Sequence, residues 1–437
     1  MDKVQSYQRL PTNRARLLSV SLPAAEIGLH PVMSRTSRDA RQKIIALLLS
    51  RGRLSRAELA RLTGLNKPTI SNLVAGLIDD GIVGEIGSGV STGGRRPILL
   101  EIRETSRVVV GTEIDARSCR LLLVSLSGDR LAEIAVPLGA TGVDDVVDAI
   151  AAGIDALCID RPRAALLGLG VAIPGLVNRA DDTVALPAPF GWKAAPLRSL
   201  LEECLDLPVL VTDRGKAAGL GEMWVLGRER AHDLIYLYLG GGVGGAVVIG
   251  QEIHWGVSNI AGEIGHMTVD PAGPLCSCGK PGCLEALVST RAIAERARLL
   301  AAGHPGSSPL ATLDMESDPA VVVRAIGPAA GAGDRLALAM VEWTAHWIGF
   351  AIANLINVLN PGAVVLGGPT SGWGDPLLRA IEREVDRWAL PLARQAVAIV
   401  IGQAGDDATT LGASALVLQQ ASDLLAQPPP AMALRME

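Results

Sequence analysis

Most of this chain alternates between short, strongly apolar segments and longer segments with helical spacing. Strands that alternate with helices pack as layered α/β units. Because 437 residues exceed one ordinary domain, we expect two α/β lobes, the first over 104–225 and completed by 405–426, the second over 226–404. The predicted strands are 108–114, 119–125, 168–173, 209–212, 234–239, 246–249, 363–366 and 396–401. The predicted helices are 143–157, 197–204, 217–224, 289–300, 319–325, 335–357, 376–388 and 409–425.

The charges are distributed unevenly along the chain. Residues 1–102 hold 15 Lys and Arg against 8 Asp and Glu, although the whole chain has a net charge of −5. A basic N-terminal segment followed by an acidic remainder is typical of a nucleic-acid-binding module joined to a larger soluble domain. Residues 1–38 lack sustained periodicity and predict a disordered tail, as does the Pro-rich segment 427–437.

Residues 39–103 have the pattern of a winged helix-turn-helix. After a first helix, Ser55 is placed to cap a second over 56–62, and Asn66 to cap a third that ends near residue 80. Segments 82–86 and 98–102 then predict a β-hairpin around a Gly/Ser-rich tip. In this arrangement the third helix enters the major groove of double-stranded DNA. The predicted DNA contacts are Lys67, Thr69, Ser71, Asn72, Arg95 and Arg96.

A cluster of metal-binding residue types follows in the second lobe. Cys276, Cys278 and Cys283 lie on a loop bent by glycines, and His266 precedes them by ten residues. Three thiolates and one imidazole make a closed tetrahedral site for structural Zn²⁺, with no open position for catalysis. The alternative is three reduced thiols beside an unrelated histidine. The other cysteines are scattered, so the chain does not have a disulfide framework.

The apolar stretches 163–175 and 344–358 are both interrupted. Glycine, proline, His346 and Asn354 break them into runs shorter than the roughly 20 apolar residues that span a bilayer. The apolar residues near the N-terminus are too few for a secretory signal peptide and are followed by Glu26. We therefore expect a cytoplasmic protein that does not cross a membrane.

Several segments together resemble the repressor/open-reading-frame/kinase (ROK) family over about residues 39–425. They are 173–175, 240–245, the Gly-Glu-Ile-Gly-His run at 262–266, the cysteine loop, 367–368 and 405–408. The resemblance implies a two-lobed actin-like (ribonuclease-H-like) ATPase fold behind the winged helix. It also implies a homodimer or a dimer of dimers, and either sugar kinase activity or sugar-responsive repression.

The resemblance assigns a ligand role to three residues. Glu263, His266 and Glu285 match positions that contact sugar hydroxyls in the family's kinases. One ring nitrogen of His266 would bind zinc while the other meets the sugar, so that the metal orients a ligand-binding loop. The alternative for Glu263 and Glu285 is a purely structural role as hydrogen-bond partners of the cysteine loop.

The chain departs from the kinase pattern at three places. An ungapped match of 211–222 puts Arg214 on the catalytic aspartate and Asp213 on the asparagine before it; a guanidinium cannot accept a proton. Ala188 replaces a sugar-binding asparagine, and residues 115–118 lack the glycines of the first phosphate loop. Glycines 240–245 remain either as a second phosphate loop or for close strand packing.

These observations favour a DNA-binding transcriptional regulator, in expectation a repressor of carbohydrate-metabolism genes, that senses a sugar or sugar-derived molecule and has no catalytic residues. Two alternatives stay open. One is an ATP-dependent, glucokinase-like sugar kinase with an added DNA-binding module. The other is a regulator whose body docks a protein partner.

Overall fold

The computed structural model describes residues 35–88, 97–178, 183–185, 190–227, 231–303 and 318–427. Within these residues the chain divides into two units. Unit 1 comprises Ala172–Pro196 and Thr212–Gly412, and unit 2 comprises the residues up to Val171, Leu197–Val211 and the segment from Ala413. The boundary differs from the one expected from sequence. Residues 172–196, 212–225 and 405–412, assigned to the first lobe, belong to unit 1, and the winged helix belongs to unit 2 with the rest of that lobe.

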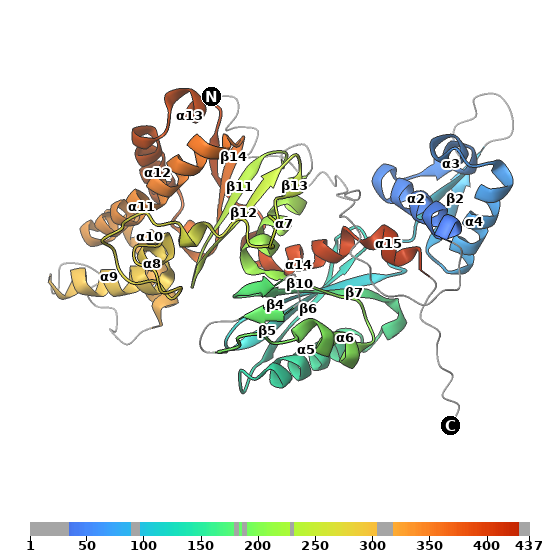
Figure 1. The fold of residues 1–437 in the computed structure, drawn as a ribbon, viewed down its shortest axis with the longest axis horizontal. Coiled ribbons are helices and arrows are strands. Elements are labelled where there is room, and N and C mark those ends of the chain that lie inside the picture. The colour runs from blue at the N-terminus through green and yellow to red at the C-terminus, as the bar shows by residue number, and fades with distance from the viewer. Residues whose placement is uncertain are drawn as a thin grey trace. The chain divides into compact units, whose positions relative to one another are not determined.

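The winged helix is confirmed in its predicted order (Figure 1). Its elements are α2 (Arg35–Arg51), β1 (Leu54–Ser55), α3 (Arg56–Thr63), α4 (Lys67–Asp79), β2 (Val83–Ser88) and β3 (Ile98–Ile102). Ser55 and Glu58 form a capping box at the start of α3, and the Asn66 side chain accepts the Thr69 amide at the start of α4. Both predicted caps are therefore present. Strand β1 was not expected, and it pairs with β3 at the edge of the sheet.

Apolar packing and one buried ion pair hold the winged helix together. Ile44 and Leu48 of α2 and Ile70 of α4 are fully buried. The Arg41 guanidinium pairs with Asp80 just after α4, which joins the first helix to the end of the third. Helix α2 begins at Arg35, so the last four residues of the segment 1–38 are helical rather than part of a disordered tail. The other residues of that segment lie outside the described part of the chain.

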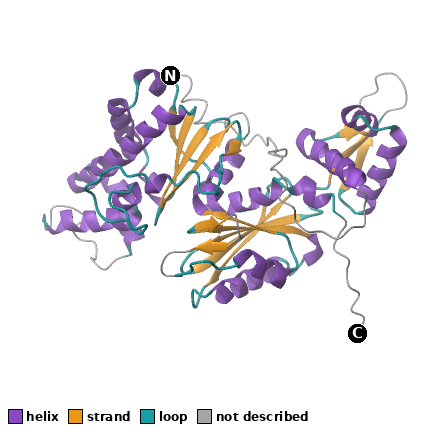
Figure 2. Cartoon of the chain, in the orientation of Figure 1, coloured by secondary structure: helices purple, strands orange, loops and turns teal. Residues whose placement is uncertain are grey.

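The α/β part of unit 2 is a five-stranded sheet in the order β10-β7-β4-β5-β6. Helices α5 and α6 lie on one face, and α14 packs on β7 from the other, where a Cβ at Gly170 would lie 1.8 Å from the Ala413 carbonyl oxygen (Figure 2). The sequence did not reveal β6, because this edge strand is largely exposed and has few buried positions. The elements are β4 (Val108–Ile114), β5 (Ser118–Ser125), β6 (Arg130–Pro137), α5 (Val143–Leu157), β7 (Leu166–Ile173), α6 (Leu197–Leu205), β10 (Val209–Asp213), α14 (Ala408–Leu418) and α15 (Ala421–Leu425).

Unit 1 contains a second five-stranded sheet, in the order β13-β12-β11-β14-β15. Both sheets thus place their strands in the order third, second, first, fourth and fifth, which is the ribonuclease-H-like arrangement expected for two related lobes. In unit 1, β14 runs parallel to β11 and β15, and the β11–β12–β13 part is antiparallel. The strands are β11 (Leu234–Leu239), β12 (Val243–Ile249), β13 (Glu252–Ile253), β14 (Ala363–Gly367) and β15 (Ala398–Ile401), with a separate hairpin of β8 (Leu176–Asn178) and β9 (Thr183–Ala185).

Helices cover both faces of this sheet, which explains why its central strands β11 and β14 are almost entirely buried. Ile235, Leu237 and Leu239 of β11 join the main core with the helices on one face. On the other face, the alternate residue Tyr236 lies beside α7. The helices are α7 (Arg214–Leu226), α8 (Leu284–Val288), α9 (Thr290–Ala302), α10 (Pro319–Gly331), α11 (Arg335–Leu359), α12 (Asp375–Trp388) and α13 (Pro391–Gln395).

Helix α7 is the central helix of unit 1, and ten of its thirteen residues are buried. Glycines allow its backbone to touch neighbours on two sides. A Cβ at Gly215 would lie 2.6 Å from the Gly245 amide nitrogen of β12, and one at Gly221 would lie 2.0 Å from the Ala408 carbonyl oxygen. At the buried end of α7, Glu222 accepts backbone hydrogen bonds from Gln403 and Ala404. Burial raises the pKa of Glu222, and these two hydrogen bonds oppose the rise.

The C-terminal part of the chain returns to the winged helix. The single final helix expected over 409–425 is instead two helices, because the chain turns between Leu418 and Ala421. The second of these, α15, packs against α2, and both belong to unit 2. The Asp423 carboxyl of α15 is close enough to Arg38 of α2 for the guanidinium to lower its pKa, although burial raises that pKa by more.

Helix α11 is long and apolar enough to cross a membrane by length and composition alone. In the fold, however, 61% of its apolar window is buried inside the protein, where it forms the centre of the unit 1 core. A core helix passes the same test, so this helix alone is weak evidence for a membrane span.

We predict that Gly412→Ala destabilises the protein by about 1–3 kcal/mol or more, because the new Cβ would overlap backbone that cannot move aside. That atom would lie 1.6 Å from the Ala217 carbonyl oxygen of α7. The matched control is Gly331→Ala at the end of α10, where a Cβ meets nothing within 4 Å. Thermal and denaturant unfolding should separate the two variants, and equal stability would contradict the packing described for α7.

Candidate functional site

Helix α4 presents a polar face to solvent. Lys67, Ser71 and Asn72 are exposed and Thr69 is partly exposed, whereas Ile70 on the opposite side is fully buried. An exposed helix face of this composition can reach phosphates and base edges in a major groove. The structure therefore leaves these four residues available for DNA contact. Arg95 and Arg96 lie outside the described residues, so their predicted contact remains an expectation from sequence.

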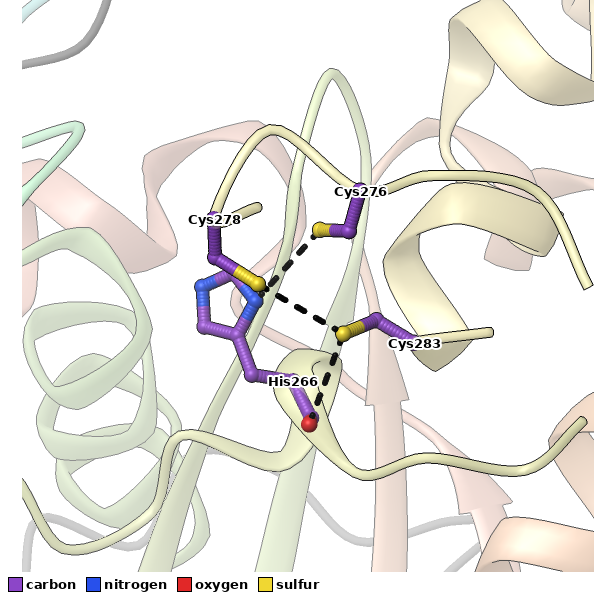
Figure 3. A group of neighbouring side chains, drawn as sticks. All are labelled: His266, Cys276, Cys278 and Cys283. Atoms are coloured by element: carbon purple, nitrogen blue, oxygen red, sulfur yellow. Dashed lines mark hydrogen bonds between the residues drawn. The ribbon is translucent and has the colours of Figure 1, made fainter. Parts of the chain in front are cut away.

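A second group of side chains gathers four metal-ligand atoms (Figure 3). The ligand atoms of His266, Cys276, Cys278 and Cys283 all lie within 4.8 Å of one another. The Cys276 Sγ atom is 3.7 Å from His266 Nδ1, and the Cys278 and Cys283 sulfurs are 3.6 Å apart. A tetrahedral ion bonded at about 2.3 Å to sulfur holds such ligands about 3.8 Å apart. These residues therefore fit a single metal ion.

Tight turns bring the four residues together. His266 ends a short 3₁₀ helix (Ile264–His266), and Cys283 immediately precedes α8. Gly282, with φ of 69°, lies against Asp270, where a Cβ would be 1.5 Å from the carbonyl oxygen. Only glycine fits there. The backbone amide of Lys280 lowers the pKa of Cys278, which favours the thiolate that binds metal.

The Glu263 side chain is placed by the glycines around it. A Cβ at Gly265 would lie 1.9 Å from the Val243 carbonyl oxygen, and one at Gly262, with φ of 86°, would lie 3.1 Å from the Gly245 carbonyl oxygen. The segment 262–266 is therefore pressed against β12. The His266 ring points Nδ1 at the three sulfurs, while its Nε2 atom points away from them (Figure 3). This geometry leaves Nε2 able to contact a ligand.

A buried lysine joins Glu263 to the start of α7. The Lys216 Nζ atom lies 2.6 Å from Asp213 Oδ2 and 3.7 Å from Glu263 Oε1. Asp213 also caps α7, since its Oδ1 atom accepts the Lys216 backbone amide. Burial raises the pKa of Glu263, as does the Asp213 carboxylate, and the Lys216 ammonium opposes both. Sequence reasoning missed Lys216, although a lone charge among the small residues 215–221 was a visible signal.

Glu285 has partners inside the protein. Its Oε2 atom accepts the Val243 amide at 3.0 Å, and its Oε1 atom accepts the Ser277 hydroxyl at 3.2 Å. Gly242 lies directly beside it, since a Cβ there would be 2.8 Å from Oε2. These contacts favour the structural alternative for Glu285, in which it ties the cysteine loop to the glycine-rich turn. A direct contact with sugar remains an expectation.

Most glycines of the run 240–245 are closely packed, except Gly241, where a Cβ would meet nothing within 4 Å. It connects β11 to β12, and Gly245 touches both α7 and the Gly262 loop. In unit 2, the turn after β4 has no glycine, and the Ala116 amide donates to its neighbour Asp115 Oδ1. Arg214 is the first residue of α7, directly after the Asp213 cap. Ala188 lies outside the described residues.

Comparison with known proteins matches the winged helix and the α/β body to two separate families. Residues 109–420 match the ROK family, and residues 38–83 match a winged helix-turn-helix DNA-binding family. A xylose repressor of Caldicellulosiruptor bescii is 29% identical over 88% of this chain and 96% of its own length. A glucokinase of Halalkalibacterium halodurans is 33% identical over 73% of this chain and 98% of its own length. The repressor thus matches across the winged helix, and the glucokinase covers a smaller share of the chain.

A solved structure also has this fold. The crystal structure of a ROK family transcriptional regulator, described as a homologue of the Escherichia coli MLC protein, superposes with a TM-score of 0.76. It covers 90% of this chain and 98% of its own, at 24% identity. The predicted combination of a winged helix with an actin-like, two-lobed body is confirmed by this likeness.

We predict that the purified protein contains one metal ion per chain and that Cys278→Ala abolishes it. Because a metal site of this kind stabilises the fold directly, the variant should also unfold at a lower temperature. Cys204→Ala is the matched control, since Cys204 is an exposed cysteine outside the cluster. Elemental analysis of protein prepared without chelators tests the prediction, and a wild-type protein without metal would refute it.

Proposed function

Because this chain belongs to the ROK family, we propose that it is a sugar-responsive transcriptional repressor of carbohydrate-metabolism genes. One observation carries the proposal: a complete winged helix with an exposed polar recognition helix precedes the ROK body in the same chain. The likeness to a xylose repressor extends over 88% of the chain and supports the same function. A regulator of this kind acts in the cytoplasm on double-stranded DNA.

The recognition helix is α4. Asn72, and with it Thr69 and Ser71, would read base edges, whereas Lys67 at the helix start would bind phosphate. Arg95 and Arg96 would reach the DNA backbone or the adjacent minor groove from the wing. A homodimer, or a dimer of dimers, would place two recognition helices on half-sites about one helical turn apart or a multiple of it. The operator is therefore an inverted repeat.

The sugar would bind where Glu263 and His266 meet. A carboxylate accepts hydrogen bonds from sugar hydroxyls, and the Nε2 atom of His266 is available while Nδ1 faces the metal cluster. Glu285 supports the same loop through Val243 and Ser277. Sugar binding would change the affinity of the winged helix for DNA. The contact of α15 with α2 gives the body a direct physical connection to that domain.

The metal is structural Zn²⁺. Three cysteines and one histidine form the closed ligand set that zinc takes in structural sites, with no position left for a reacting water. The ion would fix the His266 ring through Nδ1 and hold the loop that carries Glu263. Its role is thus to preserve the shape of the ligand site.

The protein is not an enzyme in this proposal. The likeness to a glucokinase makes an ATP-dependent sugar kinase the second candidate. Against it, α7 is an uninterrupted helix from Arg214, which supports the ungapped match that puts arginine at the position of the catalytic base. The turn at 115–118 lacks the glycines that let backbone amides approach a triphosphate.

We predict no sugar-dependent ATP consumption, because losing a general base typically costs about 10²–10⁴ in rate. Arg214→Asp alone should not restore activity, since residue 188 and the 115–118 turn remain changed. A coupled assay with D-glucose and D-xylose measures this. Sugar-dependent turnover at an ordinary rate of about 1–10³ s⁻¹ would favour the kinase instead.

We predict different effects from two kinds of substitution in the winged helix. Asn72→Ala should change which sequences are preferred, because it removes a contact to base edges. Lys67→Ala should weaken binding to all sequences and reduce the salt dependence by about one unit of slope. The double variant Arg95→Ala, Arg96→Ala should act in the same way as Lys67→Ala.

The measurement is selection of bound genomic fragments, followed by salt titrations on the recovered operator. Lys193→Ala is the matched control, since it removes the same charge from an exposed position outside the winged helix. A wild-type protein that enriches no DNA site, with or without D-xylose and D-glucose, would contradict the proposed function.

A further inference from the structure

Lys216 is a fully buried lysine beside Glu263, one of the two residues of the proposed ligand site. It has 0% exposure, and it lies on α7 among glycine and alanine. Burying an ammonium group is costly unless carboxylates and hydrogen bonds compensate for the lost water. An apolar side chain of similar length, such as methionine, would fill this space without that cost. The presence of a charge therefore calls for a role in the electrostatics of its neighbours.

Two carboxylates from different elements share this ammonium. Asp213 comes from the junction of β10 and α7 and lies 2.6 Å from Nζ, while Glu263 comes from the loop that leads into the metal cluster and lies 3.7 Å from Nζ. The Nζ group thus interacts with one carboxylate from each of two elements. Without it, the Asp213 carboxylate and the partly buried Glu263 carboxylate would face each other, which favours the binding of a proton to one of them.

The ammonium itself cannot reach a ligand, whereas the carboxylates can. The Lys216 side chain is 1% exposed, compared with 13% for Asp213 and 25% for Glu263. Among the described residues, the charged groups that act on Glu263 are the carboxylates of Asp213 and Glu285, the Lys216 ammonium and His266. Three carboxylates therefore stand against one ammonium that is already paired. A ligand bound beside Glu263 would therefore meet hydrogen-bond acceptors and a net negative electrostatic potential from these groups.

We propose that Lys216 is the positioning residue that sets ligand class: its buried ammonium holds Asp213 and Glu263 together as ionised acceptors for the hydroxyls of an uncharged sugar. The same field repels a phosphate group, so a sugar phosphate is excluded. This inference rests on the proposed function, because it concerns the same ligand site. It adds Asp213 to the ligand contacts, and it gives Lys216 a role that acts through both carboxylates.

The first experiment compares ligands on the wild-type full-length protein with its metal. Thermal shift and operator release are measured with D-glucose and D-xylose and with their matched phosphates, D-glucose 6-phosphate and D-xylose 5-phosphate. We expect at least one free sugar to bind, and its phosphate to bind at least about tenfold more weakly. A phosphate that binds as tightly as its parent sugar, or more tightly, overturns the inference.

The second experiment tests Lys216 itself. Lys216→Met keeps the length of the side chain but removes its charge, and sugar affinity should fall at least about tenfold while metal content and operator binding persist. Lys193→Met is the matched control. Asp213→Asn removes one carboxylate and should narrow the gap between sugar and sugar phosphate. In the double variant Lys216→Met, Asp213→Asn, the effects of the two substitutions on sugar affinity should not add, because both substitutions disrupt the same ion pair.

The outcomes separate the possible failures. A folded Lys216→Met protein with unchanged sugar affinity assigns the lysine a purely structural role and overturns the inference. If that variant does not fold, Glu263→Gln keeps the Lys216–Asp213 pair, and unchanged affinity in it overturns the inference equally. Operator release by a sugar phosphate alone refutes the inference but leaves the proposed function intact. A protein that binds neither operator nor sugar refutes both.

Discussion

The close backbone contact between α7 and its neighbours determines the position of Asp213 and Lys216. Gly215 lies against Gly245 of β12, and on the other side Gly412 lies against the Ala217 carbonyl oxygen. A helix held at this distance has no freedom to shift along its axis, because any added atom would overlap backbone. Its first turn therefore presents Asp213 and Lys216 at one place. Gly244 and Gly245 pack against Gly215, whereas Gly241 meets nothing within 4 Å, so the choice between a phosphate loop and a packing feature stays open for the run 240–245.

The metal cluster and the ligand residues share one support, which is strand β12. The Gly265 backbone is pressed against Val243, and the Glu285 carboxylate accepts the amide of the same residue. Segment 262–266 thus connects Glu263 to the His266 ligand within four residues. A change in the cysteine loop would move the His266 ring and, through it, the acceptor beside Lys216. Through this connection, an ion bound by the cluster would affect the affinity of the proposed ligand site without touching the ligand.

The features that could be predicted from the sequence are those that depend on residues close together in the chain. Ser55 and Asn66 could be recognised as caps, and the cysteine spacing with His266 indicated a metal cluster, because both depend on residues near one another in the chain. Long-range contacts could not be predicted in this way. The Lys216–Glu263 pair joins residues 47 positions apart, and the partners of Glu285 lie on two other segments. Strand β6 was missed because its residues are mostly exposed, and the break after α14 because apolar spacing continues across it.

Of the departures from the kinase pattern, Arg214 begins α7 beside Asp213, whereas the turn at 115–118 belongs to a different unit from Glu263. The glycine-free turn at 115–118 belongs to the β4–β5 hairpin of unit 2, which is held by its own antiparallel register. Glu263 and the metal cluster belong to unit 1, where β12 and α7 position them. The contacts described for Glu263 and for the metal cluster are made by residues of unit 1. In the proposed function, this chain would lack the groups that bind and activate a phosphoryl donor and would keep an acidic site for a sugar. Joined to a winged helix in the same chain, such a site would only have to bind its ligand in order to act on DNA.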